Sequence, residues 1–268
     1  MKSRFLVYLA ALVGVASGAY FFYEWADRQF RYQNIALEAS FFPSSAESPP
    51  SAEALAILTQ PFFYLDSGKQ SFAFVSGDGQ YVLKFFDRSR LRQWSDHTLA
   101  HARMEQAVHG YVTAALYDSD HVGLLYLHAT SRGHNLPTIP LTDRFGWTHR
   151  IDLNAVPFIL QKKAVPTRLV ISAYLDRGEG VAAQRALDAL MAMYADEHTR
   201  GVYDTDRNLL YNTGFVGEVP MRIDAGRLVI DESLKDPFNS QNEIDILKRK
   251  RVDPWLKRHA YFLQSSSQ

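Results

Sequence analysis

Hydrophobic and polar residues are arranged differently in three parts of the chain. Residues 5–23 form an apolar run without a charged side chain. The segment "FPSSAESPPSAE", which starts at Phe42, is rich in Ser and Pro, as linkers and surface loops are. Beyond it, apolar residues recur at strand or helix spacing. We therefore expect three regions, a membrane anchor or signal peptide at 1–23, a stalk or linker at 24–51 and one folded domain at 52–268.

The N-terminal run has two interpretations. At about 1.5 Å per residue, its length is sufficient to cross a hydrocarbon core of about 30 Å as a helix. Alternatively, the run up to Val15 is the centre of a signal peptide, and Ala16-Ser17-Gly18 supplies small residues for cleavage. The length and the aromatic far end from Tyr20 favour an uncleaved anchor, since Tyr is enriched at the lipid–water interface. We expect single-pass attachment to membrane lipid through residues 5–23, or secretion if residues 1–18 are removed.

The charges that flank this run bear on the side of the membrane. Lys2 and Arg4 precede it, while Arg28 and Arg31 follow it together with two acidic residues. Because the more positive flank stays in the cytoplasm, the balance weakly favours an extracytoplasmic main domain.

The front of the expected domain has the pattern of strands. From Phe62, "FFYLD" and "SFAFVS" flank Gly68, and "QYVLKFF" follows a Gly-containing turn, which predicts three short strands in meander order. The segment "RMEQAVHGYVTAALY" then has helical spacing. Three further segments predict strands, "GLLYLHAT", "THRIDL" and "VPFILQKKAV".

The back of the domain is richer in helices. "GVAAQRALDALMAMYADEHTRG" predicts a long helix that ends at Gly201. An acidic loop, "GVYDTDRNLLYNTGF", follows it, and "VPMRIDAGRLVI" indicates two strands around a Gly turn. A charged helix, "NEIDILKRKRVDPWLKRH", closes the chain. The expected fold class is therefore α+β, with a strand-rich front and a helix-rich back.

Composition narrows the chemistry. The chain has 29 basic and 29 acidic residues, and this balance does not suggest nucleic-acid binding. It has no cysteine, which excludes disulfides, thiolate nucleophiles and cysteine-based zinc sites.

Four features occur in an order that suits phosphoryl transfer: the strands with Gly68 and Lys84, the helix with Glu105, the acidic loop at 204–208 and the segment at Asp224. That reaction needs a flexible loop whose backbone approaches phosphates, a lysine that pairs with them and a carboxylate that holds the lysine. It also needs an Asp that orients the acceptor, and an Asn and a further Asp that hold Mg²⁺. The candidates in chain order are Gly68, Lys84, Glu105, Asp204, Asp206, Asn208 and Asp224.

Each candidate also has a purely structural interpretation. Lys84 can be an edge-strand lysine whose ammonium reaches water past apolar neighbours. Glu105 can be a solvated helix residue, and Asp204 and Asp206 can be turn residues. Asp224, followed by Gly226, can belong to a turn at the end of a strand. Only the common order of these residues favours a shared site.

In this order the segments resemble the protein-kinase-like fold, including its aminoglycoside and lipid-sugar phosphotransferase relatives. "YVLKFF" is similar to the third-strand lysine segment of that family, "RNLLYN" to the end of its catalytic loop and "IDAG" to its metal-binding Asp-Phe-Gly. The resemblance covers about residues 62–228. It implies a two-lobed domain that binds ATP and Mg²⁺.

The resemblance also implies roles for the seven candidates. The backbone at Gly68 approaches the phosphates, and Lys84 pairs with them while Glu105 holds the lysine. Asn208 and Asp224 hold Mg²⁺, and Asp204 or Asp206 orients the acceptor hydroxyl.

Four departures from the family bear on the reaction. "LDSGKQSF" has one glycine where the family has three, and Val202-Tyr203 replaces the His-Arg pair. Asp204 precedes Asn208 by four positions instead of five, and "DAG" lacks the Phe. No Ala-Pro-Glu follows, so the resemblance implies transfer to a small molecule or lipid, or a non-catalytic pseudokinase or scaffold, and not protein phosphorylation.

Other sites are less consistent with the sequence. The acidic loop begins like an EF-hand, but Leu209 and Phe215 stand where Gly and Glu are required. His97 and His101 are four residues apart, but no Glu completes a zinc motif of known spacing with them. The basic "KRKRVDPWLKR" is typical of a solvated helix end and also suits contact with acidic lipid.

Overall fold

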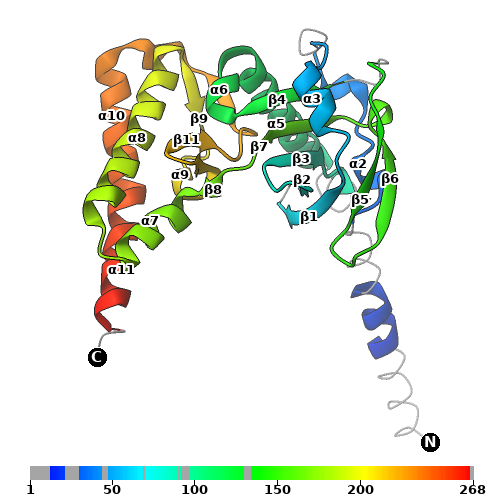
Figure 1. Cartoon of the computed structure of the whole chain (residues 1–268), viewed down its shortest axis with the longest axis horizontal. Coiled ribbons are helices and arrows are strands. Elements are labelled where there is room, and N and C mark those ends of the chain that lie inside the picture. The colour runs from blue at the N-terminus through cyan, green and yellow to red at the C-terminus, as the bar shows by residue number, and fades with distance from the viewer. Residues whose placement is uncertain are drawn as a thin grey trace, which may run out of the picture.

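The protein has a strand-rich part and a helix-rich part that lie side by side (Figure 1). The computed structural model describes residues 13–21, 30–43, 48–68, 70–89, 91, 97–129 and 134–265. The predicted α+β fold class is confirmed.

The N-terminal apolar run lies partly outside the described residues, and residues 13–21 of it are helical. Among the described residues, no helix combines the length and apolar character needed to cross a bilayer.

A seven-stranded sheet forms the strand-rich part, in the order β4-β7-β3-β2-β1-β5-β6. Its strands are β1 (Phe62–Ser67), β2 (Ser71–Ser76), β3 (Tyr81–Phe86), β4 (Leu124–His128), β5 (Thr138–Thr142), β6 (Thr148–Asp152) and β7 (Phe158–Lys162). The predicted meander of the first three strands is present, with antiparallel pairing. β5 and β1 are parallel neighbours.

The sequence pattern did not predict β5, which contains Pro140. Proline lacks the N–H that a central strand donates. β1 pairs with β5 at Leu141 and Thr142, beyond this proline, so Pro140 needs to pair only with β6.

Helix α5 (His97–Tyr117) packs on one face of the sheet. Phe86 of β3 joins Met104 and Val108 of α5 in one hydrophobic cluster, while Phe85 joins a different cluster on the other face. Because successive strand side chains alternate between faces, Lys84 shares the face of Phe86 and points towards α5. The helix begins earlier than the predicted segment, at His97.

Residues 30–42, which we expected in a stalk, contribute to the core. The Phe30 ring packs edge-on against Phe72 and Phe74, with centroid distances of 5.5 and 4.9 Å. Ile35 is also fully buried. This segment contains α2 (Tyr32–Ile35) and the 3₁₀ turn η1 (Ala39–Phe41), and α3 (Ala52–Ile57) follows with Ser51 as its N-cap. Burial of large aromatic side chains removes much apolar area from water, and this hydrophobic gain explains why the segment packs against the sheet.

The helix-rich part surrounds a third hydrophobic cluster. Its helices are α7 (Thr167–Asp176), α8 (Gly180–Thr199), α9 (Leu209–Asn212), α10 (Pro237–Leu247) and α11 (Asp253–Ser265), with a π-helical turn at Lys248–Val252. Two small sheets accompany them, formed by β8 (Val165–Pro166), β9 (Val202–Asp204), β10 (Thr213–Val216), β11 (Val219–Arg222) and β12 (Leu228–Ile230). The remaining short elements are α6 (Ser119–Val122) between α5 and β4, η3 (Leu153–Ala155) between β6 and β7, and η4 (Glu232–Lys235) between β12 and α10.

Candidate functional site

Lys84 is a buried residue of a central strand and not an edge lysine. β3 lies between β2 and β7, and Lys84 is 7% exposed. Its ammonium donates a hydrogen bond to the Tyr111 hydroxyl on α5 at 3.2 Å and another to the Ile223 carbonyl. The Tyr111 hydroxyl in turn donates to Asp224 at 3.4 Å. Tyr111 therefore links the lysine to the first residue of the Asp-Ala-Gly segment.

Burial and the Asp224 charge shift the titration of both partners. Burial lowers the pKa of Lys84 below its usual range, and the nearby Asp224 opposes that shift. Burial also raises the pKa of Tyr111 well above 10, and the charge of Asp224 adds to the effect. Tyr111 is thus a neutral hydroxyl that contacts both the Lys84 amino group and the Asp224 carboxylate.

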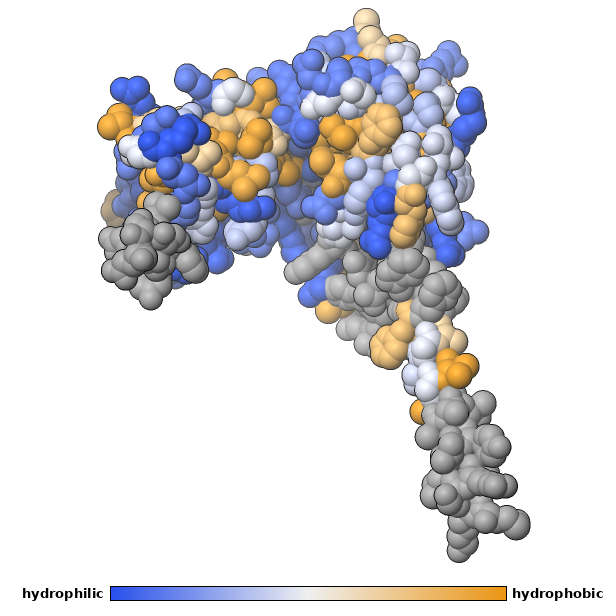
Figure 2. Space-filling view, turned by 60° about the horizontal axis from the view of Figure 1, so that its bottom comes forward, coloured by the Kyte–Doolittle hydropathy of each residue, from blue (hydrophilic) through white to orange (hydrophobic). Residues whose placement is uncertain are grey.

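A cavity of about 270 Å³ lies beside this chain of contacts. It sits between the strand-rich and helix-rich parts, and Figure 2 shows the boundary between them as a recess. Four of the predicted residues share its lining, Gly68, Asp206, Asn208 and Asp224. The other lining residues are Gln70, Ser71, Phe86, Ala107, Tyr111, Gly226 and Arg227.

Gly110 lets α5 contact the Asp224 segment directly. A Cβ atom at this position would lie 2.3 Å from the Ala225 carbonyl oxygen, which no side chain tolerates. The segment turns sharply there, because the Gly226 amide donates to an Asp224 carboxylate oxygen at 2.9 Å. A glycine inside a helix destabilises it by about 1 kcal/mol relative to alanine, so a glycine there usually has a packing reason. Gly110 within the helical pattern is therefore the sequence feature that could have indicated this close contact.

Asn212 connects the acidic turn to Asp224 and was not predicted. Its side-chain amide donates to Asp206 at 2.9 Å. Its carbonyl accepts from the amides of Ile223 and Asp224 at 2.7 and 3.1 Å. The turn itself includes Arg207 with a positive φ of 53°. Asn212 is the last residue of "RNLLYN", the segment in which Asn208 was predicted as a site residue.

Glu105 does not meet Lys84. It lies on the exposed side of α5, where its half-exposed carboxylate is 3.4 Å from His101 Nδ1. The buried face of the helix instead carries Met104, Ala107, Val108 and Tyr111. Because neighbouring helix positions are rotated by about 100°, Glu105 points away while Tyr111 reaches the lysine.

Asp204 also lies apart from the cavity lining. It is buried, and its Oδ2 accepts from the Arg222 guanidinium at 2.8 Å. Its Oδ1 accepts from the Asp206 amide at 2.9 Å. Of the two candidates for orienting an acceptor, Asp206 is the one that lines the cavity.

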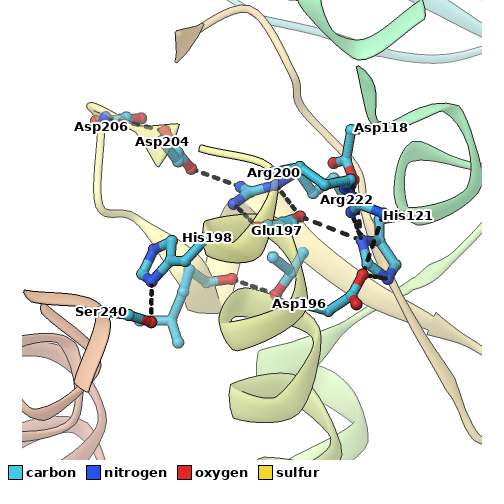
Figure 3. A network of polar contacts seen from close by, with 12 residues as sticks. Asp118, His121, Asp196, Glu197, His198, Arg200, Asp204, Asp206, Arg222 and Ser240 are labelled. Atoms are coloured by element: carbon cyan, nitrogen blue, oxygen red, sulfur yellow. Dashed lines mark hydrogen bonds and ion pairs between the residues drawn. The ribbon is translucent and has the colours of Figure 1, made fainter. Parts of the chain in front are cut away.

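Arg222 is the centre of a buried ionic network (Figure 3). Its Nε and Nη2 donate to the two carboxylate oxygens of Glu197 at 2.7 and 2.6 Å, and both side chains are shielded from water. Its guanidinium also lies 4.6 Å from the centroid of the Tyr194 ring. Burial raises the pKa of Glu197, and the charge of the paired Arg222 opposes that shift.

Asp118, His121 and Glu197 form a second group with metal-ligand chemistry. One ligand atom from each lies within 4.8 Å of the others. However, Arg200 donates to Asp118 at 2.6 Å, and both oxygens of Glu197 accept from Arg222. Two guanidinium groups already neutralise this cluster, so the cavity carboxylates are the better candidates for a cation.

Comparisons with known proteins add little to this geometry. No protein-family model matches the chain, and no curated protein matches its sequence. Among solved structures, the chain is similar to Rv3197 from Mycobacterium tuberculosis, determined as a complex with erythromycin. The match has 15% sequence identity and a TM-score of 0.33, and it covers 83% of this chain and 67% of Rv3197. A TM-score this low carries no argument about the fold or the ligand of this chain.

Proposed function

We propose that this chain is a divergent kinase-like protein that binds ATP with Mg²⁺ in the cavity and transfers phosphoryl groups to a small molecule or lipid. One observation carries the proposal. Gly68, Asp206, Asn208 and Asp224, which are far apart in the sequence, line one cavity beside the Lys84–Tyr111–Asp224 contacts.

The order of elements supports a kinase-like interpretation. In that family the phosphate-binding lysine lies on the third strand, a helix follows it, and the metal-binding Asp comes after the catalytic loop. Here Lys84 lies on β3, α5 follows, and Asp224 comes after the acidic turn and the β10–β11 pair. The cavity lies between the part with the lysine and the part with the turn.

The donor atoms suit the proposed ligand. Mg²⁺ prefers oxygen ligands, and Asp224 and Asn208 supply a carboxylate and an amide oxygen at the same cavity. Bound Mg²⁺ would neutralise negative charge on the phosphates. The backbone at Gly68 lines the same cavity, and without a Cβ it does not hinder close approach of a phosphate.

Asp206 is the proposed acceptor-orienting residue, in preference to Asp204. Its position is set from two sides, by the Asn212 amide at its carboxylate and by Asp204 at its backbone N–H. Tyr111 is a positioning residue that holds Lys84 where Glu105 was expected to act.

A second candidate is a nucleotide-binding protein without catalysis. The locked position of Asp204 and the absence of a Lys84–Glu105 contact favour it, since two parts expected in an active kinase lie elsewhere. Both candidates require the same nucleotide site and differ in turnover.

A thermal-shift titration of the detergent-solubilised full chain with ATP and Mg²⁺ tests the site. A ligand at about 100 times its Kd stabilises the folded state by about 2.7 kcal/mol, so Tm should rise. We expect Lys84→Met and Asp224→Asn to abolish the rise, and Lys163→Met, which changes an exposed lysine after β7, to retain it. If the unmodified chain shows no rise, or if both site variants retain it, the nucleotide site is wrong.

Release of ADP in the same samples separates the two candidates. ADP formation that depends on Asp206 supports phosphoryl transfer. A thermal shift without ADP formation, measured across small-molecule and lipid acceptors, supports the binding protein. A shortened chain for such work should start before Phe30, because that residue is buried in the core.

A further inference from the structure

Large apolar side chains are exposed at one end of the seven-stranded sheet. Phe63 and Leu65 of β1 are 45% and 42% exposed, and Phe145 and Trp147 between β5 and β6 are 45% and 69% exposed. We call these four residues the apolar rim. Single exposed apolar side chains are ordinary, but a group of them marks an interaction surface.

The strand register explains why the rim residues gather. β1 and β5 run parallel, with Phe63 opposite Thr142. The residues that follow Phe63 in one strand and Thr142 in the other therefore extend in the same direction. Leu65 and the β5–β6 turn consequently lie at the same end of the sheet.

The β5–β6 turn holds its aromatic residues in a defined arrangement. The Asp143 carboxylate accepts from the amides of Phe145 and Trp147 at 2.9 and 3.0 Å, and it contacts His149 Nε2 at 2.7 Å. Gly146 supplies the positive φ of 83° that the turn requires. A turn ordered in this way loses little conformational entropy when its rings enter a partner.

The N-terminal segment joins the folded part close to this turn. Phe30 packs against His149 of β6, with their ring centroids 5.3 Å apart. Only residues 24–29 separate Phe30 from the uncharged run at 5–23, and a connection of this length spans about 25 Å at most. In Figure 1, the turn of the β5–β6 hairpin lies on the side from which the helical residues 13–21 project.

We propose that residues 5–23 anchor the chain in a bilayer, as their apolar length predicts, and that the apolar rim docks into the lipid–water interface of that bilayer. Trp and other amphipathic aromatic residues favour that interface. The guanidinium of Arg144 lies 4.9 Å from the Phe145 ring, which places a cation among the aromatic groups where anionic headgroups would meet it. The short connection keeps the rim near the membrane, so docking needs no separate capture of the domain. The inference does not depend on nucleotide binding.

Fluorescence quenching by brominated lipid tests the docking. The chain has four Trp residues, which are Trp25, Trp94, Trp147 and Trp255. A full-chain variant with Trp147 alone, the others changed to Phe, is reconstituted into nanodiscs of phosphatidylcholine and phosphatidylglycerol. Phospholipid brominated near the headgroup then reports contact at interface depth.

Phe238 provides the matched control. It is 80% exposed and belongs to the first turn of α10. In Figure 1, α10 lies at the opposite side of the molecule from β5 and β6. In the control chain all four Trp residues become Phe, and Phe238→Trp supplies the sole fluorophore. Far-UV circular dichroism of both chains checks that they are folded.

The expected result is a blue-shifted and quenched Trp147, with the Phe238→Trp chain unaffected. Replacing Phe63, Leu65 and Phe145 with Ser in the Trp147-only chain should reduce the quenching. Equal quenching in the two chains, or no quenching of Trp147, would overturn the proposal. A third outcome would also overturn it. If the Trp147 emission is blue-shifted in unbrominated lipid but is not quenched in brominated lipid, the rim contacts a protein partner or a second copy of the chain and not lipid.

Discussion

The cavity around Asp224 and the buried network around Arg222 contain the same types of charged residue but differ in the partners of their carboxylates. Both oxygens of Glu197 and one of Asp204 are paired with Arg222 inside the chain. Asp206, Asn208 and Asp224 instead line an open space. Charges that the chain itself neutralises maintain the fold, whereas the cavity carboxylates accept hydrogen bonds from neutral donors and border a space that a ligand can enter.

The two regions are connected by a hydrogen bond between Asp204 and the backbone of Asp206. Asp204 belongs to the network, yet its second oxygen holds the amide of Asp206 at 2.9 Å. The network thus sets the position of a residue that lines the cavity. Substitutions in the network should therefore reduce stability, whereas substitutions at the cavity should reduce ligand binding.

Removal of the central cation should have the largest effect. Arg222→Ala leaves Glu197 and Asp204 buried without their partner, and such a loss costs about 3–5 kcal/mol. Urea denaturation measures it. Arg177→Ala, which breaks the exposed pair with Glu179, should leave the midpoint nearly unchanged. Equal midpoints for the two variants would contradict the structural role of the network.

Acidification should weaken the same region through His198. Burial, helped by the Arg222 charge, lowers the pKa of His198 from 6.5 to about 4. Below pH 6.5 the unfolded chain takes up a proton that the folded chain does not, so this stability is lost progressively as the pH falls from 6.5 to 4. The full loss is about 3 kcal/mol. His198→Gln should show a smaller decrease in Tm between pH 7 and 4, and equal decreases would refute the assignment.

Two neighbouring Asp-to-Asn changes should divide the two regions most clearly. Asp204→Asn weakens a charged hydrogen bond to Arg222 and should destabilise the fold by about 1.5–3 kcal/mol. Asp206→Asn changes a residue at the cavity and should have little effect on Tm while it removes ADP formation. Denaturation and turnover of both variants provide the comparison. If Asp206→Asn keeps full turnover, Asp206 does not orient the acceptor.

Removal of one hydroxyl at the cavity should have the smallest effect. Tyr111→Phe breaks the link between Lys84 and Asp224 and should cost about 1 kcal/mol. Tyr117→Phe on the same helix is the control, since Tyr117 is half-exposed. Thermal denaturation compares them. A Tyr111→Phe variant as stable as the control would mean that the hydroxyl contributes nothing to holding the lysine.

Local pattern was sufficient for much of the sheet and for part of the site. Short apolar segments separated by Gly-containing turns predicted β1, β2 and β3, and Lys84 was identified because it interrupts an apolar strand. Glu105 was misleading because sequence order does not specify which side of a helix meets the sheet. β5 and the packing of residues 30–42 depended on contacts with distant strands, which no local window contains.

The sequence by itself determined the α+β composition, the early strands and the acidic segments that bring oxygen atoms to the site, because these follow from side-chain periodicity and turn chemistry. Only the tertiary structure decided which carboxylate is bound to Arg222 and which lines the cavity. Asp204 and Asp206 are two residues apart and chemically identical, so their difference arises from burial and from a partner on another strand. Tyr111 became the partner of Lys84 for the same reason, because packing of α5 on the sheet, and not proximity in the chain, brings its hydroxyl to the ammonium group.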